Sequence, residues 1–232
     1  MIRQLLPACV AVVEAFRDVI GEAVFPGEED LVANATESRR REFITTRRCA
    51  REALAKLGYK PLPIRSGPKR EPQWPAGVVG SIAHTTGYRV AAVASQHFIA
   101  SIGVDAEQHE RLPDGVEEFV TAPGEAQMLA SLSKTFPAIH WSRLLFSVKE
   151  SVYKAWYPLT GRWLGFEHVQ VTINPQGTFS ATLLADGTRT DNGTSLTEVR
   201  GGFVLERGLI ATAVTVPWRL SSHSKRNDHG AA

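Results

Sequence analysis

An apolar run that ends in two carboxylates is the feature that most constrains the fold of this chain. Residues 101–110 read SIGVDAEQHE, so Asp105 and Glu107 follow the apolar residues at a spacing of two. Side chains two residues apart on a β-strand point to the same face. The two acids would then repel each other, unless a positive charge lies between them. A strand that simply ends in water would give the same pattern, so the acids alone leave a surface role open.

A second charged segment, residues 146–156, has helical spacing and reads FSVKESVYKAW. It places Glu150 and Lys154 four residues apart, on one helix face. An exposed pair of this kind would be worth only ~0.3–0.5 kcal/mol. The segment is apolar enough to be largely buried, however, and a buried helix needs partners for Lys149 as well as for these two residues. Asp105, Glu107 and Glu150 together with a lysine would suit Mg²⁺ and a phosphate-bearing substrate. Spacing alone does not decide between a surface salt bridge and a metal site.

The densest run of charge is ESRRREFITTRRCAREAL, residues 37–54. A solvated helix face is the usual interpretation of such a run. At about 100° per residue, Arg39 and Arg47 lie roughly 40° to either side of Phe43, which begins an apolar stripe, whereas Arg41 and Arg48 point to the opposite face. We therefore expect Arg39 and Arg47 to reach into a cleft, where guanidinium groups bind phosphate well.

A short polar segment, GSIAHTTG, precedes an apolar strand in the first half of the chain. It carries Ser81, His84 and Thr85. A single histidine is more often structural than functional. A turn of this composition beside a basic cleft could instead donate hydrogen bonds to a phosphate group.

The distribution of apolar, proline and glycine residues predicts an α+β fold of two lobes. Asn34 and Glu37 form a helix-capping pattern, and the helix is expected to end near Leu57, before Gly58. Residues 60–77 are rich in proline and glycine and are expected to form an extended loop. The other expected elements are a strand or short helix over 5–16, strands over 88–94 and 98–104, helices over 124–132 and 139–156, and strands over 168–173, 178–185, 201–206 and 209–216.

The predicted organisation is an N-terminal lobe over residues 1–108 and a C-terminal lobe over 109–218, with a hinge at 109–115. The polar tail, residues 219–232, is expected to be disordered.

Composition excludes several classes of protein. The net charge of +2 argues against a bulk nucleic-acid binder. No apolar run approaches the roughly 20 residues that span a bilayer, so no membrane partner is expected. Cys9 and Cys49 are the two cysteines, which indicates free thiols rather than a disulfide framework. Because Pro7 and Glu14 interrupt the apolar start, a secretory signal is not expected, and we predict a cytoplasmic protein.

Several segments together resemble one family, the Sfp-type 4′-phosphopantetheinyl transferases of the EntD-like subgroup. The resemblance rests on GVVGSIAHTTGYRVAAV, SIGVDAEQHERLP and LLFSVKESVYKAWYPLTGRWLGFE, which are similar to the three signature blocks of the family. REFITTRRCAREAL and PQWPAGVVGS also resemble that subgroup. The match runs from about Arg39 to Glu167.

The resemblance implies a monomer of two similar α+β lobes related by a pseudo-twofold axis. Coenzyme A would bind between the lobes as co-substrate. The enzyme would move the phosphopantetheine group to a serine of an apo acyl or peptidyl carrier protein, with Mg²⁺, or alternatively Mn²⁺, as the metal. The subgroup suggests secondary metabolism, such as polyketide, nonribosomal-peptide or siderophore synthesis.

The resemblance also assigns roles to residues. Asp105, Glu107 and Glu150 would be the metal ligands, with Glu150 also taking the serine proton and Lys154 steadying the phosphate charge. Coenzyme A would be bound by Arg39, Arg47, Ser81, His84 and a basic residue of the loop, for which Lys69 is favoured over Arg70 and Arg65. Lys149 would reach a phosphate or the surface. Tyr153 and Trp163 would line the pantetheine channel or belong to the core.

Two other functions fit parts of the pattern. A metal-dependent nuclease also uses clustered acids and a lysine, but its second cluster would follow on a neighbouring strand rather than on a helix. A non-catalytic module that binds coenzyme A or a carrier protein would not need Glu150. Replacing Glu150 by glutamine tests this alternative, because in an enzyme the variant should still bind its ligand but should lose turnover.

Overall fold

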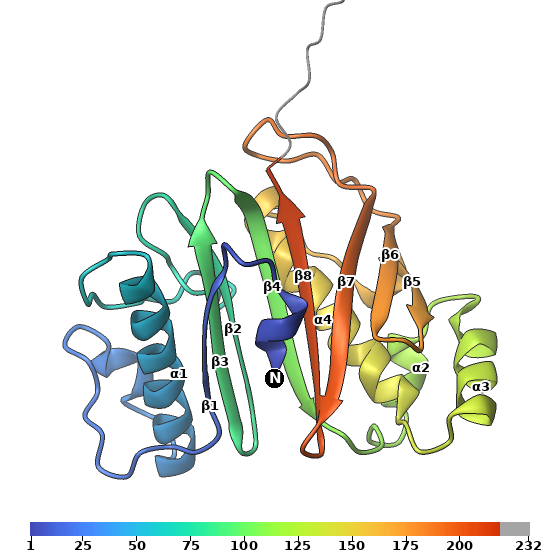
Figure 1. Cartoon of the computed structure of the whole chain (residues 1–232), viewed down its shortest axis with the longest axis horizontal. Coiled ribbons are helices and arrows are strands. Elements are labelled where there is room, and N and C mark those ends of the chain that lie inside the picture. The colour runs from blue at the N-terminus through green and yellow to red at the C-terminus, as the bar shows by residue number, and fades with distance from the viewer. Residues whose placement is uncertain (219–232) are drawn as a thin grey trace, which may run out of the picture.

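The computed structural model describes residues 1–218, which form two antiparallel sheets with helices packed against them (Figure 1). This arrangement confirms the predicted α+β class. The predicted disordered tail, residues 219–232, lies outside the described residues. Among residues 1–218, no helix is long and apolar enough to cross a membrane.

The N-terminal sheet has three strands in the order β1-β3-β2 and is covered by the long helix α1. Its elements are β1 (Ala11–Ala15), α1 (Glu37–Lys56), β2 (Val78–Thr85) and β3 (Tyr88–Ser95), preceded or interrupted by the 3₁₀ turns η1 (Ile2–Leu5) and η2 (Glu29–Val32). Buried Ala50 and Leu54 of α1 pack against Ala91 and Val93 of β3, as the predicted apolar stripe requires. The small residues at this interface let the helix lie close to the sheet.

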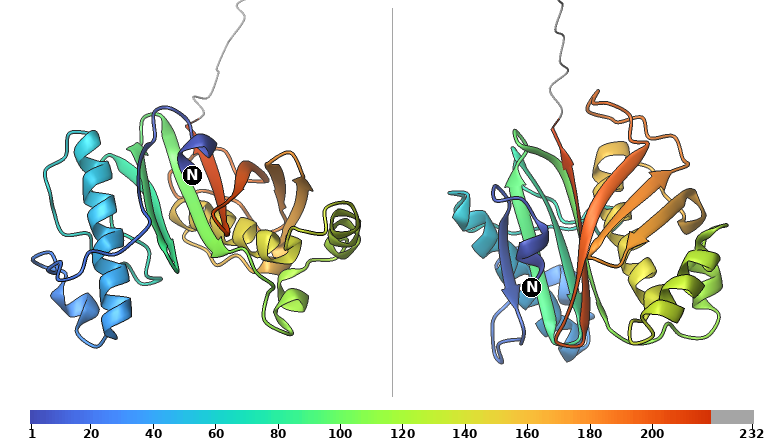
Figure 2. Two further views of the ribbon diagram at one scale, coloured as in Figure 1. Left: turned by 60° about the horizontal axis from the view of Figure 1, so that its bottom comes forward. Right: turned by 45° about the vertical axis from the view of Figure 1, so that its right-hand side comes forward.

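The C-terminal sheet has five strands in the order β4-β8-β7-β6-β5. Its strands are β4 (Ile99–Gln108), β5 (Val169–Asn174), β6 (Thr178–Leu183), β7 (Glu198–Glu206) and β8 (Leu209–Pro217). Helix α4 (Trp141–Thr160) packs on it, with α2 (Val116–Val120), α3 (Glu125–Thr135) and η3 (Phe166–His168) nearby. Figures 1 and 2 show α1 against the three-stranded sheet and α4 against the five-stranded sheet.

Two local predictions are corrected by the structure. The N-cap of α1 is Thr36, whose Oγ1 accepts the Arg39 N–H at 3.3 Å, so Asn34 is not the cap. The segment GSIAHTTG, interpreted as a turn, lies mostly in strand β2, which is paired with β3 along its whole length. Gly80 made this segment resemble a turn, because glycine is common in turns. In the structure it is required by a close approach to β3, since a Cβ at this position would lie 2.7 Å from the Ala92 carbonyl oxygen.

Strand β4 also differs from the prediction, because it does not end at the two acids. It continues to Gln108, with Asp105 opposite Thr212 and Glu107 opposite Ile210 of β8. Because β4 is hydrogen-bonded to β8, it belongs to the five-stranded sheet, and the lobe boundary at residue 108 stays a prediction. The two sheets have three and five strands. Strand β4 of the larger sheet also contacts β2 of the smaller one, where the Val104 N–H donates to Ser81 Oγ at 3.1 Å. The strand that bears the acids thus joins the two lobes.

Lys149 is part of the core and is not available to a phosphate, which corrects its predicted role. Its side chain is 1% exposed. The ammonium donates to Glu125 Oε2 at 2.7 Å and to the carbonyl oxygens of Val120 at 2.8 Å and Phe166 at 2.9 Å. All three donors are therefore used to hold α4 against α2, α3 and η3.

Replacing Lys149 by methionine should destabilise the fold strongly. The substitution leaves the buried Glu125 carboxylate without its counter-charge and costs about 3–5 kcal/mol of unfolding free energy, measured by chemical denaturation. Lys134→Met, on the exposed side of α3, is the matched control and should change stability little. If Lys149→Met weakened ligand binding without lowering stability, the structural role assigned to Lys149 would be wrong.

Candidate functional site

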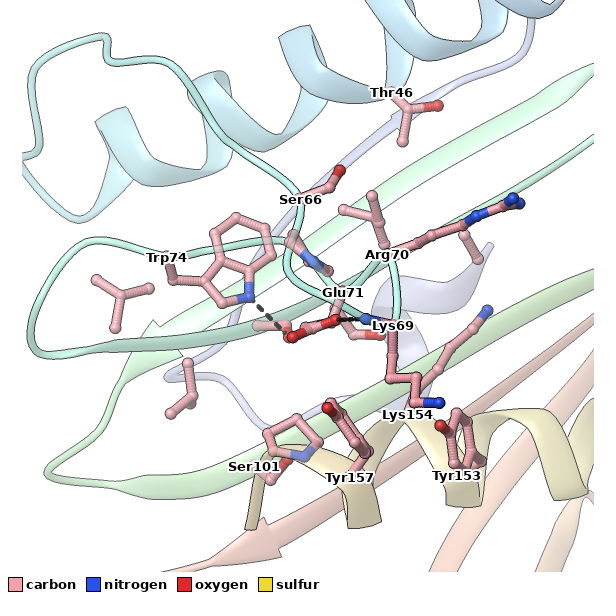
Figure 3. A pocket seen from close by; sticks show the side chains of 18 of the residues that line it. Thr46, Ser66, Lys69, Arg70, Glu71, Trp74, Ser101, Tyr153, Lys154 and Tyr157 are labelled. Atoms are coloured by element: carbon pink, nitrogen blue, oxygen red, sulfur yellow. Dashed lines mark hydrogen bonds between the residues drawn. The ribbon is translucent and has the colours of Figure 1, made fainter. Parts of the chain in front are cut away.

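A large cavity of about 1540 Å³ lies between the two lobes. Its walls come from α1, from β2, from the loop over residues 66–74 and from the outer face of α4. Figure 3 shows Thr46 of α1 on one side, Tyr153, Lys154 and Tyr157 of α4 on the other, and the loop between them. Small-molecule sites commonly have ~300–1,000 Å³, so this cavity can hold a large ligand.

The position of α4 is fixed by a close contact with β4. A Cβ added to Gly103 would lie 1.8 Å from the Ser151 carbonyl oxygen and 2.8 Å from the Ala155 nitrogen. Only glycine therefore allows the helix backbone to approach the strand this closely. Gly103 shares a strand face with Asp105 and Glu107, so the same contact brings α4 over both acids.

Asp105 is held by two side chains of α4. Asp105 is 5% exposed. Its carboxylate accepts hydrogen bonds from Ser147 Oγ at 2.8 Å and from Lys154 Nζ at 2.7 Å, and it forms an ion pair with Lys154. Ser147 Oγ also lies 3.0 Å from Thr212 Oγ1 of β8. Lys154 lines the cavity and Asp105 lies behind it.

Burial raises the pKa of both Glu107 and Glu150. Burial and the charge of Asp105 raise the pKa of Glu107 to about 7, although Arg143 donates to Glu107 Oε2 at 3.1 Å and opposes the shift. Burial and the same Asp105 charge raise the pKa of Glu150, which lines the cavity. Asp105 is therefore electrostatically coupled to both glutamates.

The three acids fit a hard divalent cation in the chemistry of their donors. Carboxylate oxygens are the protein ligands that Mg²⁺ uses, and the Asp105 charge that raises the pKa of Glu107 and of Glu150 indicates a place where a cation would be stabilised. In residues 1–218, no group of three or more His, Cys, Asp or Glu side chains is already arranged to hold a metal ion. Instead, Lys154 pairs with Asp105 and Arg143 pairs with Glu107.

Arg39 and His84 form a polar contact on the cavity wall, as the helical-wheel prediction required for Arg39. Arg39 Nη1 lies 2.7 Å from His84 Nε2 and, since a guanidinium cannot accept, the imidazole accepts. Burial and the nearby Arg39 charge lower the pKa of His84 to about 4, so the ring is neutral at pH 7. Both residues line the cavity.

Arg47 is the most deeply buried cation of the cavity wall. It is 3% exposed, and burial lowers its pKa to about 10. Nη2 donates to Ser66 Oγ at 3.1 Å and the guanidinium lies over the Phe43 ring, but Nε has no hydrogen-bond partner among the described residues. A buried guanidinium with an unused donor suits an anionic ligand.

The basic loop places Lys69 and Arg70 at the cavity, whereas Arg65 is paired elsewhere. Arg65 binds the Asp30 carboxylate and the Gly27 carbonyl oxygen, which excludes it as the loop ligand. The Lys69 N–H donates to Glu71 Oε2 at 2.8 Å and fixes the turn. Lys69 and Arg70 both line the cavity, so the choice of Lys69 stays a prediction.

The remaining predicted residues lie as follows. Ser81 lines the cavity and its Oγ accepts from Val104. Tyr153 lines the cavity too, and its ring centroid is 5.1 Å from that of Trp163. Trp163 is 70% exposed, so it is not a core aromatic. The prediction missed Arg143, although its spacing of four from Ser147 and seven from Glu150 indicated a shared helix face.

Comparison with known proteins gives matches over most of the chain. Residues 27–94 match the 4′-phosphopantetheinyl transferase N-terminal domain, and residues 101–205 match the 4′-phosphopantetheinyl transferase superfamily. The chain is 44% identical to the 4′-phosphopantetheinyl transferase PptT of Mycobacterium tuberculosis over 93% of this chain and 98% of that protein. It is 46% identical to the 4′-phosphopantetheinyl transferase Svp of Streptomyces mobaraensis over 93% and 89%.

A weaker match covers about half of each chain. Enterobactin synthase component D of Salmonella typhi is 34% identical over 54% of this chain and 52% of that protein.

Gly103→Ala should destabilise the protein by at least about 3 kcal/mol, because the new methyl group meets the backbone of α4 and cannot be accommodated without moving the helix. Denaturant unfolding measures the loss. Gly202→Ala on β7, where a Cβ would meet no atom closer than 3.2 Å, is the control and should cost much less. Equal stability of the two variants would contradict the close packing of α4 on β4.

The depressed pKa of His84 predicts how stability changes with pH. Between pH 6.5 and about 4, the unfolded chain binds a proton at this position and the folded protein does not, so stability should fall as pH falls through this window. His84→Gln should reduce the slope of unfolding free energy against pH in this range. An unchanged slope would show that His84 titrates normally.

Proposed function

This chain belongs to the 4′-phosphopantetheinyl transferase superfamily, and from this premise we propose that it transfers the 4′-phosphopantetheine group of coenzyme A to a serine of apo acyl or peptidyl carrier proteins. The observation that carries the proposal is one cavity whose wall has cations on α1 and on the loop over residues 66–74, and an acid with a lysine on α4. The expectations of a monomer and of a cytoplasmic location stay predictions.

The nucleotide end of coenzyme A fits the side of the cavity formed by α1 and the loop. Arg47 has a buried, partly unused guanidinium, and Arg39 and His84 lie beside it on the wall. Lys69 and Arg70 add positive charge from the loop. Guanidinium and ammonium groups bind phosphate by charge-assisted hydrogen bonds, so this side would hold the phosphate groups of the nucleotide.

The pyrophosphate fits the side formed by α4. Asp105, Glu107 and Glu150 would hold Mg²⁺, or Mn²⁺ in its place, and the bound metal would supply positive charge to the pyrophosphate oxygens. Lys154 is positioned by Asp105 and presents its ammonium to the same part of the cavity. Ser147 orients the Asp105 carboxylate from the opposite side.

The chain's own residues account for the transfer chemistry. The serine oxygen forms a bond to the phosphorus that bears the pantetheine arm, and the bond from that phosphorus to the bridging oxygen breaks. Glu150, whose pKa is raised, takes the serine proton, and adenosine 3′,5′-bisphosphate leaves. Lys154 stabilises the negative charge that develops on the phosphate groups.

The proposed activity is tested by intact mass of an apo carrier protein incubated with this protein, coenzyme A and Mg²⁺. We expect the carrier to gain the mass of one phosphopantetheine group. A chelator should abolish the gain, and added Mg²⁺ or Mn²⁺ should restore it.

Glu150→Gln should lower the rate of transfer at least ~100-fold while coenzyme A still binds, because the variant lacks the base and one metal ligand. Glu118→Gln, an exposed position on α2, is the control and should transfer at the wild-type rate. Normal turnover by Glu150→Gln would overturn the role of Glu150. Binding of coenzyme A with no transfer to any carrier by the wild type would favour the binding module.

A further inference from the structure

A carboxylate lies behind the cationic wall of the cavity. Glu42 follows Arg39 by three residues on α1, and its Oε2 accepts from Arg39 Nη1 at 3.2 Å. Its Oε1 is 3.4 Å from Arg89 Nη2, and the Oε2 atom is 3.8 Å from His84 Nδ1. Arg39 and His84 line the cavity and Glu42 does not. The charge of Glu42 is thus within reach of three basic side chains but set back from the ligand.

Glu42 is not required to hold these side chains in place. Arg39 is also bonded to His84 Nε2 at 2.7 Å. Arg89, on β3, donates to Asp18 Oδ2 at 2.8 Å, to the Tyr88 carbonyl oxygen at 2.9 Å and to the Thr85 carbonyl oxygen. Each arginine therefore keeps partners when Glu42 is removed, and what Glu42 alone adds is its negative charge.

We propose that the negative charge of Glu42 is a counter-charge that lowers the affinity of the cavity for phosphate groups, so that adenosine 3′,5′-bisphosphate dissociates after transfer. This inference rests on the proposed function. A carboxylate a few ångströms behind Arg39 repels a phosphate on the other side, and in partly buried surroundings this repulsion costs binding free energy.

The counter-charge acts on a part of the ligand that does not change in the reaction. Coenzyme A and adenosine 3′,5′-bisphosphate carry the same nucleotide, so cations that bind it hold substrate and product alike. Binding the two states equally does not accelerate chemistry, and slow product release then limits turnover. Because Glu42 reduces the net positive charge of the wall, it lowers the affinity for the nucleotide and speeds dissociation of the product.

The test compares Glu42→Gln with the wild type. The amide oxygen of glutamine can still accept from Arg39, so the variant removes the charge and keeps the geometry. We expect adenosine 3′,5′-bisphosphate, titrated calorimetrically, to bind about tenfold more tightly, with a similar fall in its inhibition constant against coenzyme A. The KM for coenzyme A and the kcat should both fall.

Two further variants separate charge from support. Glu37→Gln removes a charge from the same helix at an exposed position paired with Arg41, and it should leave the affinity unchanged. Glu42→Asp keeps the charge on a shorter side chain, and the bisphosphate should bind within about twofold of the wild type. If glutamate served only to orient Arg39, the aspartate variant would bind more weakly, and this outcome would overturn the proposal even if Glu42→Gln did not fold.

The outcomes distinguish this inference from the proposed function. A wild type that transfers phosphopantetheine, with a Glu42→Gln variant that binds the bisphosphate equally or more weakly, would overturn the counter-charge alone. If the wild type binds the bisphosphate but never modifies a carrier, the proposed function is wrong, and the release role of Glu42, which depends on it, is wrong too. A wild type that binds neither nucleotide would overturn both.

Discussion

The register of one helix against one strand is the constraint on which the site depends. Along β4, Gly103, Asp105 and Glu107 repeat every two residues, and along α4, Ser151, Ser147 and Arg143 repeat every four. Two strand residues rise ~6.6 Å and four helix residues rise ~6 Å, so the two repeats match. Gly103 meets the Ser151 backbone, Asp105 meets Ser147, and Glu107 meets Arg143. With this contact fixed, Glu150 and Lys154 fall on the neighbouring helix face that opens to the cavity.

The charges of the site are balanced in two different ways. The acids at the β4–α4 contact have basic partners from α4, namely Lys154 and Arg143. On the α1 side, Glu42 pairs with Arg39 and Arg89, and Arg89 pairs more closely with Asp18. Arg47 has no ion-pair partner within 4 Å among the described residues. The cavity therefore has Arg39 and Arg47 on the α1 side and Glu150 with Lys154 on the α4 side, which suits an anionic ligand that spans both sides.

Sequence patterns predicted the elements of the fold correctly where apolar residues recur at the spacing of a strand or a helix. Alternation located the strands of the C-terminal sheet, and the helical wheel placed Arg39 and Arg47 at the cavity. The patterns failed where tertiary contacts decide. Strand β2 contains Gly80, which is required by a close backbone approach, so it resembled a turn. Lys149 has the same local surroundings as a ligand lysine, and only the fold brings Glu125 to it. Thr36 and Asn34 are both good cap residues, and local sequence does not choose between them.

The pairing of Asp105 with Lys154 has a consequence for how the protein responds to its surroundings. Since the chain supplies its own positive partner to its most buried site carboxylate, the folded state needs no outside ion to neutralise that charge. Under the proposed mechanism, loss of the divalent ion would then stop transfer without unfolding the protein. The supply of metal would set the rate of transfer, while the amount of folded protein stays the same.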